Sequence, residues 1–380
     1  MDFTNKNINL LTLHSGIWRF ADNILTVFSA IYLLSLGISF PVVALVIVCS
    51  IIFRLLTRPL SLLLSNKIGL KKALILGVLI GSGLFLVLGK VSGFNYWLLF
   101  YGLYTALYDI TYWLPYHSYY AIAGDEEKRG KQVGTQLGTV AIFQILAPIA
   151  GGLIITHLGY WPLYLSATII TLVSSIPLFF IKNISLGIPL NFKEAFKNID
   201  KRGMLMMMGD GILYIHKFIW TIVLFNLVGN YVVFGGLKTF ELLITTVMAV
   251  VLGYLLDKGK GKKIIVIGLL VSGIVIIARA LWINTIPLII ISDVILALSY
   301  LFYLSSFYVG LYNMAKKSKN TLWFHFFGEL GWDIGAIVAL STSALLFYLG
   351  VPLRFIMLFS LPGLFIVYYV LKRFYTVEKV

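Results

Sequence analysis

The chain contains one cysteine, Cys49, which lies inside an apolar segment. A single cysteine excludes a disulfide framework and a cysteine-based metal site. The sequence has no HExxH or GxSxG motif, and its five histidines are scattered rather than grouped. A GxxxxGK[ST] segment that would cradle phosphate is also missing, which argues against a cycle driven by ATP. We therefore expect no enzyme activity, no cofactor and no bound metal.

Charge is also scarce. Charged residues make up 12% of the sequence and hydrophobic residues 60%, with a mean hydropathy of +0.95. A soluble domain has about 25% charged residues, whereas apolar runs of about 20 residues span a bilayer core of about 30 Å. The first segment carries Arg19 and Asp22 and lacks a small-residue cleavage site, so we do not expect it to be a signal peptide. The composition predicts an all-α polytopic membrane protein, because a closed barrel would show short alternating segments instead.

The hydropathy pattern predicts twelve transmembrane helices, with ends that are uncertain by a few residues. Their ranges are 8–36, 41–64, 71–89, 95–122, 131–156, 160–181, 204–228, 239–256, 262–283, 286–314, 320–349 and 352–372.

Basic residues are unevenly divided between the two sets of connections. One set, with the termini, holds 22 lysines and arginines, and the opposite set holds only Lys90, Lys238 and Arg354. The positive-inside rule then places both termini in the cytoplasm of a cell-membrane protein and requires an even number of spans. Because the net charge of +15 lies in these short loops, we expect the lipid bilayer and not nucleic acid as the partner.

A basic turn occurs twice, 191 positions apart. The first copy reads LSNKIGLKK from Leu64 to Lys72, and the second reads LLDKGKGKK from Leu255 to Lys263. Repetition at half the chain length indicates two copies of one unit. The aligned positions are Asn66 and Asp257, Lys67 and Lys258, and the pairs Lys71, Lys72 and Lys262, Lys263.

The longest polar connection separates the two copies. It includes NFKEAFKNIDKRG, which is typical of a short amphipathic helix on the membrane surface. We expect a six-helix bundle over 1–182, a cytoplasmic linker over 183–203 and a second six-helix bundle over 204–380. Six spans on each side make the halves parallel repeats, related by an axis along the membrane normal.

This organisation resembles the major facilitator superfamily, whose turn after spans 2 and 8 is written G-x-x-x-D-[RK]-x-G-[RK]-[RK]. The C-terminal copy keeps Gly253, Asp257 and the basic pair, with one residue more between them. The N-terminal copy has Leu62 for the glycine and Asn66 for the acid. Such a turn either pairs with an acid or helix end in one conformation only, or is a plain positive-inside anchor. The resemblance implies pseudo-twofold symmetry and transport.

The fifth span carries a second resemblance. Gly134, Pro148, Gly151 and Gly152 resemble the pattern G-x8-G-x3-G-P-x2-G-G of drug/proton antiporters in the superfamily, with Phe143 and Ala147 replacing two glycines. The proline kinks a helix and the small residues allow a neighbouring helix to approach closely. The pattern favours export modestly, although ordinary packing also explains it. The arginine that the family has in the middle of span 4 is absent.

Polar side chains form stripes at helical spacing on four spans, and the resemblance implies that these spans line a central cavity. The stripe residues proposed for this cavity and for proton coupling are Arg19, Asp22, Asn23, Asp109, Tyr112, Tyr116, His117, Tyr120, Asp210, Tyr214, Lys217, Asp293 and Tyr300.

Three interpretations of these stripes remain open, because a charge at membrane depth needs a partner or water. Arg19–Asp22 and Asp210–Lys217 could be static ion pairs. Asp22 or Asp109 could carry a proton, with Arg19 changing partners and His117 taking part. Tyrosines and carboxylates could instead bind the solute directly, with cation–π contacts to an organic cation or contacts to a sugar or lipid headgroup.

Two further pairs of charged residues have the arrangement expected of a gate. Arg54 and Arg58 lie four residues apart on span 2, and Glu329 and Asp333 have the same spacing on span 11. In the family these spans face each other, and depth counting pairs Arg58 with Glu329 and Arg54 with Asp333. We expect these pairs to close the cytoplasmic side and to break when it opens. The alternative is pairing within one half, such as Arg54 with Asp109.

The spans contain more acids than cations, which weakly favours protons as the coupled ion. Glu241 and Arg279 are expected near the outer surface, where water can reach them. We expect a monomeric secondary active transporter of a small solute that works by alternating access, is coupled to protons and slightly favours export. The alternatives are a facilitator or importer of a sugar-like or organic-anion solute, in which Arg19 and Lys217 bind the anion, and a membrane receptor or scaffold that does not transport.

Overall fold

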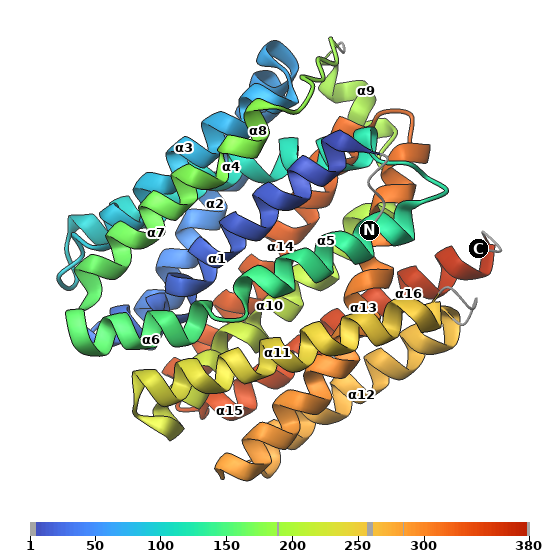
Figure 1. Cartoon of the computed structure of the whole chain (residues 1–380). Helices are drawn as coiled ribbons and strands as arrows, with labels where there is room; N and C mark the ends of the chain where they lie inside the picture. Colours follow the sequence, from blue (N-terminus) through green and yellow to red (C-terminus); the bar gives the residue numbers. More distant parts are fainter. Residues whose placement is uncertain (1–4, 188–189, 257–260, 284, 378–380) are drawn as a thin grey trace.

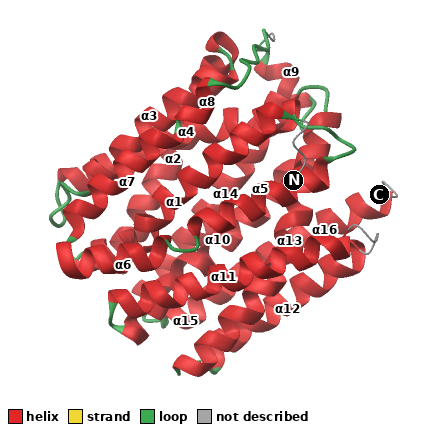
Figure 2. Cartoon of the chain, viewed as in Figure 1, coloured by secondary structure: helices red, strands yellow, loops and turns green. Residues whose placement is uncertain are grey.

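The computed structural model describes residues 5–187, 190–256, 261–283 and 285–377, and within these ranges the chain is helical and has no strand (Figure 2). The elements are α1 (Lys6–Ser35), α2 (Phe40–Ile68), α3 (Leu70–Leu88), α4 (Tyr96–Ala123), α5 (Arg129–Gln144), α6 (Ala147–Leu158), α7 (Tyr160–Ser174), α8 (Ile176–Phe179), α9 (Phe192–Lys197), α10 (Lys201–Val228), α11 (Tyr231–Leu256), α12 (Gly261–Leu281), α13 (Ile286–Lys317), α14 (Thr321–Tyr348), α15 (Leu353–Ile356), the 3-10 turn η1 (Met357–Ser360) and α16 (Leu361–Val377).

Short polar residues begin several of the long helices. Asn5 accepts a hydrogen bond from the backbone nitrogen of Ile8 at the start of α1, and Asp200 accepts one from Arg202 at the start of α10. Such caps satisfy backbone donors that the first turn leaves without a partner. Gly69 alone separates α2 from α3, with a φ of 85° that a residue with a Cβ rarely adopts. The sharp turn between these helices therefore depends on glycine.

Nine segments within the described part of the chain are long and apolar enough to cross a membrane. The other three predicted spans fall on α4, α11 and α12, so the total of twelve stays a prediction. The fifth span is broken as its proline suggested, because α5 ends at Gln144 and α6 begins at Ala147, just before Pro148. The protein is thus an all-α, multi-pass membrane protein.

The predicted start of the eighth span was wrong. We expected it at residue 239, but α11 begins at Tyr231, where the side chain of Asn230 accepts hydrogen bonds from the backbone nitrogens of Val232 and Val233. Lys238 therefore lies inside the helix and not in a loop. It forms an ion pair with Glu241, one turn further on, at 2.8 Å. A lysine with a nearby acid is tolerated in a helix that hydropathy alone would shorten.

The long polar connection contains the short helix that its sequence predicted. This helix, α9, places Phe192 and Phe196 against aromatic side chains at the start of α14, with ring centroids 5.0 Å apart for Phe192–Trp323 and 5.1 Å for Phe196–Phe327. The helix is therefore attached to the end of the second bundle by its apolar side. The division of the chain into bundles at residues 183–203 stays a prediction.

The long helices run side by side, and both ends of the chain lie at the same end of the bundle (Figure 1). We call this end the basic face, because it carries Lys71 and Lys316, and we call the other end the opposite face. We refer to α1–α8 as the N-terminal half and to α10–α16 as the C-terminal half, following the predicted division. Across the boundary, α2 packs against α14 and α6 against α11.

Candidate functional site

A central polar cluster lies midway along the helices that face the boundary between the halves. We define it as Arg19 and Asp22 on α1 and Lys217 and Tyr300 on α10 and α13. Arg19 and Asp22 form an ion pair at 3.3 Å, and their side chains are 32% and 23% exposed. Lys217 is exposed and donates a 3.4 Å hydrogen bond to the Tyr300 hydroxyl. The charges at this depth are therefore not fully enclosed by the packed helices.

The charges of the central polar cluster come from both sides of the boundary. Lys217 lies within electrostatic range of Asp210 of its own half and, more weakly, of Arg19 of the N-terminal half. The Arg19 guanidinium lies over Trp113, 5.5 Å from the ring centroid. The cluster thus joins α1 and α4 to α10 and α13, which are the helices with the predicted polar stripes.

Asp210 does not pair with Lys217 as one interpretation proposed. Its carboxylate accepts hydrogen bonds from the Tyr303 hydroxyl at 2.8 Å and from the Trp332 indole at 3.1 Å. Lys217 has no carboxylate within salt-bridge distance among the described residues. Asn23 turns to its own half, where it donates to Gln144 at 3.2 Å. The ring of Tyr214 lies tilted against that of Trp332, with centroids 5.6 Å apart.

An ionic layer lies between the central polar cluster and the basic face. We define it as Arg54 and Arg58 of α2, Asp109 of α4, and Glu329 and Asp333 of α14. Arg58 donates to Asp333 through Nε at 3.1 Å and lies 3.6 Å from Glu329. Arg54 forms an ion pair with Asp333 and donates a 2.6 Å hydrogen bond to Asp109.

Asp333 is the centre of this layer, since it is fully buried and forms ion pairs with both arginines. The cross-half contacts Arg58–Glu329 and Arg54–Asp333 and the within-half contact Arg54–Asp109 are all present together. The sequence analysis had treated the cross-half pairs and the within-half pair as alternatives. A guanidinium has five donors and can serve two carboxylates at once, which is why the alternatives coexist. Whether the layer acts as a gate stays a proposal.

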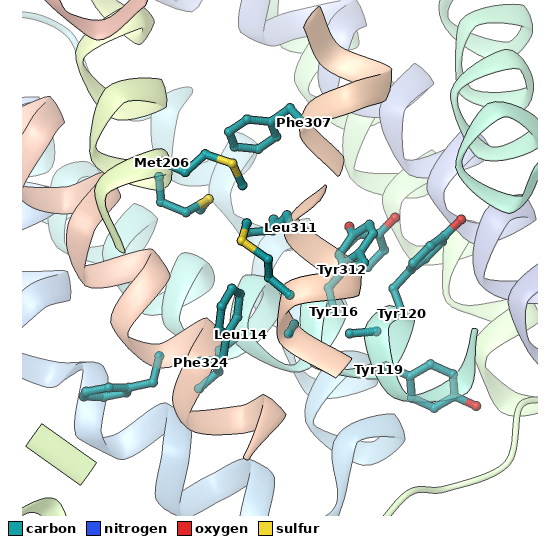
Figure 3. Packing of buried hydrophobic residues seen from close by; sticks show 14 of the residues in the cluster. Leu114, Tyr116, Tyr119, Tyr120, Met206, Phe307, Leu311, Tyr312 and Phe324 are labelled. Carbon is teal, nitrogen blue, oxygen red and sulfur yellow. The ribbon is translucent and has the colours of Figure 1, made fainter. Parts of the chain in front are cut away.

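Histidine and tyrosine side chains continue the layer towards the basic face. His117 lies 3.6 Å from Glu329 through Nε2, and its Nδ1 is 3.0 Å from the Tyr312 hydroxyl. Tyr120 stacks on Tyr312 with ring centroids 4.6 Å apart (Figure 3). These contacts cross from α4 to α13. They close the boundary with aromatic rings beneath the ionic layer.

The tyrosines of the predicted stripe on α4 lie in this packed region. Tyr112, Tyr116, Tyr120 and His117 are 0–6% exposed, in contrast to Arg19 and Lys217. Tyr112, Tyr116 and His117 have hydrogen-bond partners within the protein, such as His14 at 3.0 Å for Tyr112, whereas the buried Tyr120 hydroxyl has none among the described residues. Periodicity showed that they share a helix face, but exposure depends on the facing helix α13. In this structure they do not face water.

Asp293 does not belong to the central polar cluster, which corrects its assignment. It is 3% exposed, forms an ion pair with Arg279 and accepts a 2.9 Å hydrogen bond from the Trp220 indole. Arg279, expected to be solvated near the surface, is 2% exposed. The pair lies inside the C-terminal half, where each buried charge compensates the other. The position of Arg279 along α12 predicts its depth in the membrane, but it does not predict which neighbouring helix its side chain faces.

Sequence reasoning missed Arg129, which it counted as a loop residue. Arg129 is 1% exposed and donates to the carbonyls of Tyr120 and Ala121 at 2.9 Å, and to Asn313 of α13 at 3.4 Å. It caps the end of α4, where cations are favoured, and touches the other half. Lys316 adds a 2.6 Å bond to the carbonyl of Gly124. A basic residue just after a span was the only available signal.

The opposite face is closed without charged pairs across the boundary in the described contacts. A Cβ on Gly152 would overlap the backbone oxygen of Tyr231, and one on Gly235 would overlap that of Pro148. Gly151 is equally close to the backbone of α1. The small residues of span 5 therefore bring α6 close to α11 and α1. Gly134 is different, because nothing lies within 4 Å of its Cβ position.

The repeated basic turn is described only in its first copy. Lys71 donates to the carbonyl of Phe179 at 2.6 Å, whereas Lys67 and Lys72 are exposed and Asn66 is half-buried. Asp257 and Lys258 lie outside the described residues, as do the side chains of Lys262 and Lys263. An acid-dependent latch at this turn therefore stays a prediction.

Comparison with known proteins agrees with this architecture. The family model described as Major Facilitator Superfamily matches residues 15–244, more than half of the chain. No curated protein matches the sequence. Similar solved structures include the transporter FucP in the outward conformation, with 13% identity, 97% of this chain and 98% of that chain covered, and a TM-score of 0.69. A variant of the E. coli fucose:proton symporter FucP is also similar, with 12% identity, coverage of 97% of this chain and 98% of that chain, and a TM-score of 0.70.

The human organic anion transporter MFSD10 is also similar, with 11% identity, coverage of 98% of this chain and 100% of that chain, and a TM-score of 0.65. At these identities, likeness to the solved structures shows the fold alone. The match to the family model goes further, because it covers the helices that carry Arg19, Arg54 and Asp109. The chain belongs to the Major Facilitator Superfamily, and it is a membrane transporter of small solutes rather than an enzyme.

Proposed function

We propose that this protein is a proton-coupled secondary active transporter that works by alternating access, with its basic face towards the cytoplasm. The observation that carries the proposal is the composition of the ionic layer. It holds two guanidiniums against three carboxylates, all from membrane-spanning helices. Inside a protein, an uncompensated charge is costly. One proton bound to a carboxylate would balance the layer.

Asp109 is the best-placed carboxylate to exchange that proton. Its side chain is 17% exposed, whereas those of Asp333 and Glu329 are 0% and 7% exposed. It also interacts electrostatically with Asp22 of the central polar cluster. A proton reaching Asp22 from water is then one step from the ionic layer, so Asp22 and Asp109 are the proposed carriers.

Proton binding at Asp109 would act on the contacts between the halves. Neutral Asp109 no longer attracts Arg54, so Arg54 is held by Asp333 alone. The two arginines of α2 then balance the two acids of α14, and the link from α2 to α4 is lost. Protonation would thus change how α2 packs against α14. A proton can shift the equilibrium between two conformations only if it interacts differently with each of them.

The proposal also includes the direction of transport. Antiport, and therefore export, is favoured by the proline and glycine pattern of α5 and α6. Symport is the second candidate, and the similar FucP structure described as a fucose:proton symporter supports protons as the coupling ion.

Proteoliposomes with an internal pH-sensitive dye test the coupling. We expect solutes that are transported to cause a proton flux in the wild-type protein, and we expect Asp22→Asn and Asp109→Asn to abolish it. Glu127→Gln changes an exposed acid at the basic face and should leave the flux intact. The sign of the flux relative to the solute gradient separates antiport from symport. Solute-dependent flux that persists in both aspartate variants would refute the proposal.

A further inference from the structure

A groove lies on the outer surface of the N-terminal half, close to the basic face, and we call it the α2–α3 groove. Its volume is about 580 Å³, and it is lined by residues of α2, α3 and α4 and by Leu190 of the linker. Helices α2 and α3 meet at Gly69, but both pack on α4 far more than on each other. The two helices therefore diverge from their shared turn, and the space between them has α4 as its floor.

The wall of the α2–α3 groove is apolar. Leu76 and Ile80 of α3 and Leu107 and Ile110 of α4 line it. Leu76 and Leu107 are 37% and 41% exposed at the rim, whereas Ile110 is 3% exposed at the floor. In a multi-pass membrane protein, an apolar hollow on this surface opens to lipid chains and not to water. Its volume lies within the range of about 300–1,000 Å³ that small-molecule sites have.

The end of the α2–α3 groove at the basic face is polar. Lys67 of α2 lines this end, and its side chain is exposed. Within the described residues, its ammonium has no hydrogen-bond or ion-pair partner, in contrast to Lys71, which donates to the carbonyl of Phe179 at 2.6 Å. A lysine at a membrane surface attracts lipids with acidic headgroups. One end of the groove thus favours negative charge, and the rest favours an apolar chain.

Ser61 lies between this lysine and the apolar wall. It lines the groove, is 1% exposed, and has a hydroxyl without a hydrogen-bond partner among the described residues. A buried hydroxyl without a partner is unfavourable, so the site favours a ligand that brings an acceptor. Lys67 follows Ser61 by about 9 Å along the helix. In a phospholipid, the ester carbonyls lie between the phosphate and the acyl chains. The order of lysine, hydroxyl and apolar wall therefore matches the order of phosphate, ester and chain.

We propose that the α2–α3 groove binds one phospholipid with an acidic headgroup. Its phosphate lies at Lys67, an ester carbonyl accepts a hydrogen bond from Ser61, and one acyl chain follows the apolar wall of α3 and α4. The chain exchanges one apolar environment for another, so apolar burial adds little to the affinity. Selectivity comes from charge, because a zwitterionic lipid with the same chains places a cation near Lys67 and is repelled. The site shares no residue with the ionic layer or the central polar cluster, so its test does not depend on the proposed transport.

Photochemical cross-linking of lipids tests the site directly. The full chain is placed in nanodiscs of phosphatidylcholine, and the probe is phosphatidylglycerol or phosphatidylcholine with a diazirine in the middle of one acyl chain. Mass spectrometry then compares cross-links at residues 76–80 and 107–111 with those at Leu270 and Ile274 of α12, which are 63% and 66% exposed. We expect this ratio to be about fivefold higher for phosphatidylglycerol, the effect of one lysine. Equal ratios for the two lipids would overturn the proposal.

Two matched pairs of variants separate the groove from the rest of the membrane surface. Leu76→Trp fills the groove, whereas Leu79→Trp changes an exposed leucine of the same helix outside it. Lys67→Gln removes the charge at the groove, whereas Lys72→Gln removes an exposed charge of the same turn. We expect Leu76→Trp to abolish the groove cross-links of both lipids, and Lys67→Gln to remove only the preference for phosphatidylglycerol. Both controls should behave like the wild-type protein.

Four results would contradict the site. If Lys72→Gln reduces the preference as much as Lys67→Gln, the whole basic face and not the groove attracts the lipid. If Leu76→Trp keeps the wild-type melting temperature and leaves the cross-links unchanged, the chain lies elsewhere. If glycerol 3-phosphate competes, the headgroup binds without the chains. If p-benzoylphenylalanine at Leu107 cross-links to a second copy of the chain instead of to lipid, protein occupies the groove.

Discussion

Towards the basic face, the two halves are joined by buried charges, with Asp333 in ion pairs with Arg54 and Arg58. At the opposite face they are joined by close backbone packing at Gly152 and Gly235 and by aromatic contacts such as Phe28–Phe234, 5.6 Å between centroids. Charges respond to protons and to water entry, whereas close packing responds to side-chain volume. We therefore expect proton binding to control the opening of the basic face, and side-chain volume to control the opening of the opposite face.

The largest effect should come from removing the centre of the ionic layer. Asp333→Ala leaves two guanidiniums facing a buried site without their shared partner. Removing one partner of a buried ion pair costs about 3–5 kcal/mol. We expect a corresponding loss of thermal stability and of transport. Glu329→Gln serves as the comparison, since its contact to Arg58 is longer at 3.6 Å, and its loss should be clearly smaller. Equal losses would argue against Asp333 as the centre.

An intermediate effect should come from adding volume at the opposite face. Gly152→Ala puts a methyl group against the backbone of Tyr231, and overpacking of this kind costs about 1–3 kcal/mol. The variant should be less stable and should label faster at cysteines placed near Tyr231. Gly134→Ala, where nothing lies within 4 Å, is the control and should gain up to about 1 kcal/mol from helix propensity. If both variants lose stability alike, close approach of α6 and α11 is not the cause.

The smallest effect should come from the exposed charges at the rim of the basic face. Lys317 and Glu126 form an ion pair at 3.3 Å across the halves, and their side chains are 47% and 42% exposed. Exposed pairs contribute about 0–1 kcal/mol and are screened by salt. Lys317→Ala should therefore change the melting temperature slightly at low ionic strength and not at high ionic strength. A large effect that persists in salt would show that the rim, and not the ionic layer, holds this face.

Sequence reasoning came close for features that depend on spacing along a helix. The depth of Arg54, Arg58, Glu329 and Asp333 could be counted from helix ends, and the structure brings these four side chains together. The break at Pro148 follows from the missing amide donor and the ring of proline. These features are local or depend on a single helix direction.

Features that depend on which neighbour faces a residue could not be predicted. Arg279 was expected near the outer surface and Asp293 in the central cavity, but only the packing of α12 on α13 shows that they pair. Arg129 follows a span like any anchoring lysine, yet its side chain turns back to the end of α4. Long flexible side chains leave several partners within reach, and the tertiary contacts decide among them.

The central claim is that the two faces open in alternation and that the protonation state of Asp109 controls whether the basic face opens. In a Cys49→Ser background, spin labels at Lys67 and Lys319 report the basic face, and labels at Phe94 and Tyr348 report the opposite face. Pulsed electron paramagnetic resonance measures both distances. We predict that Asp109→Asn, which imitates the protonated acid, lengthens only the basic-face distance, and that Gly152→Ala lengthens only the opposite-face distance. If both variants lengthened the same distance, or Asp109→Asn lengthened neither, the account would be contradicted.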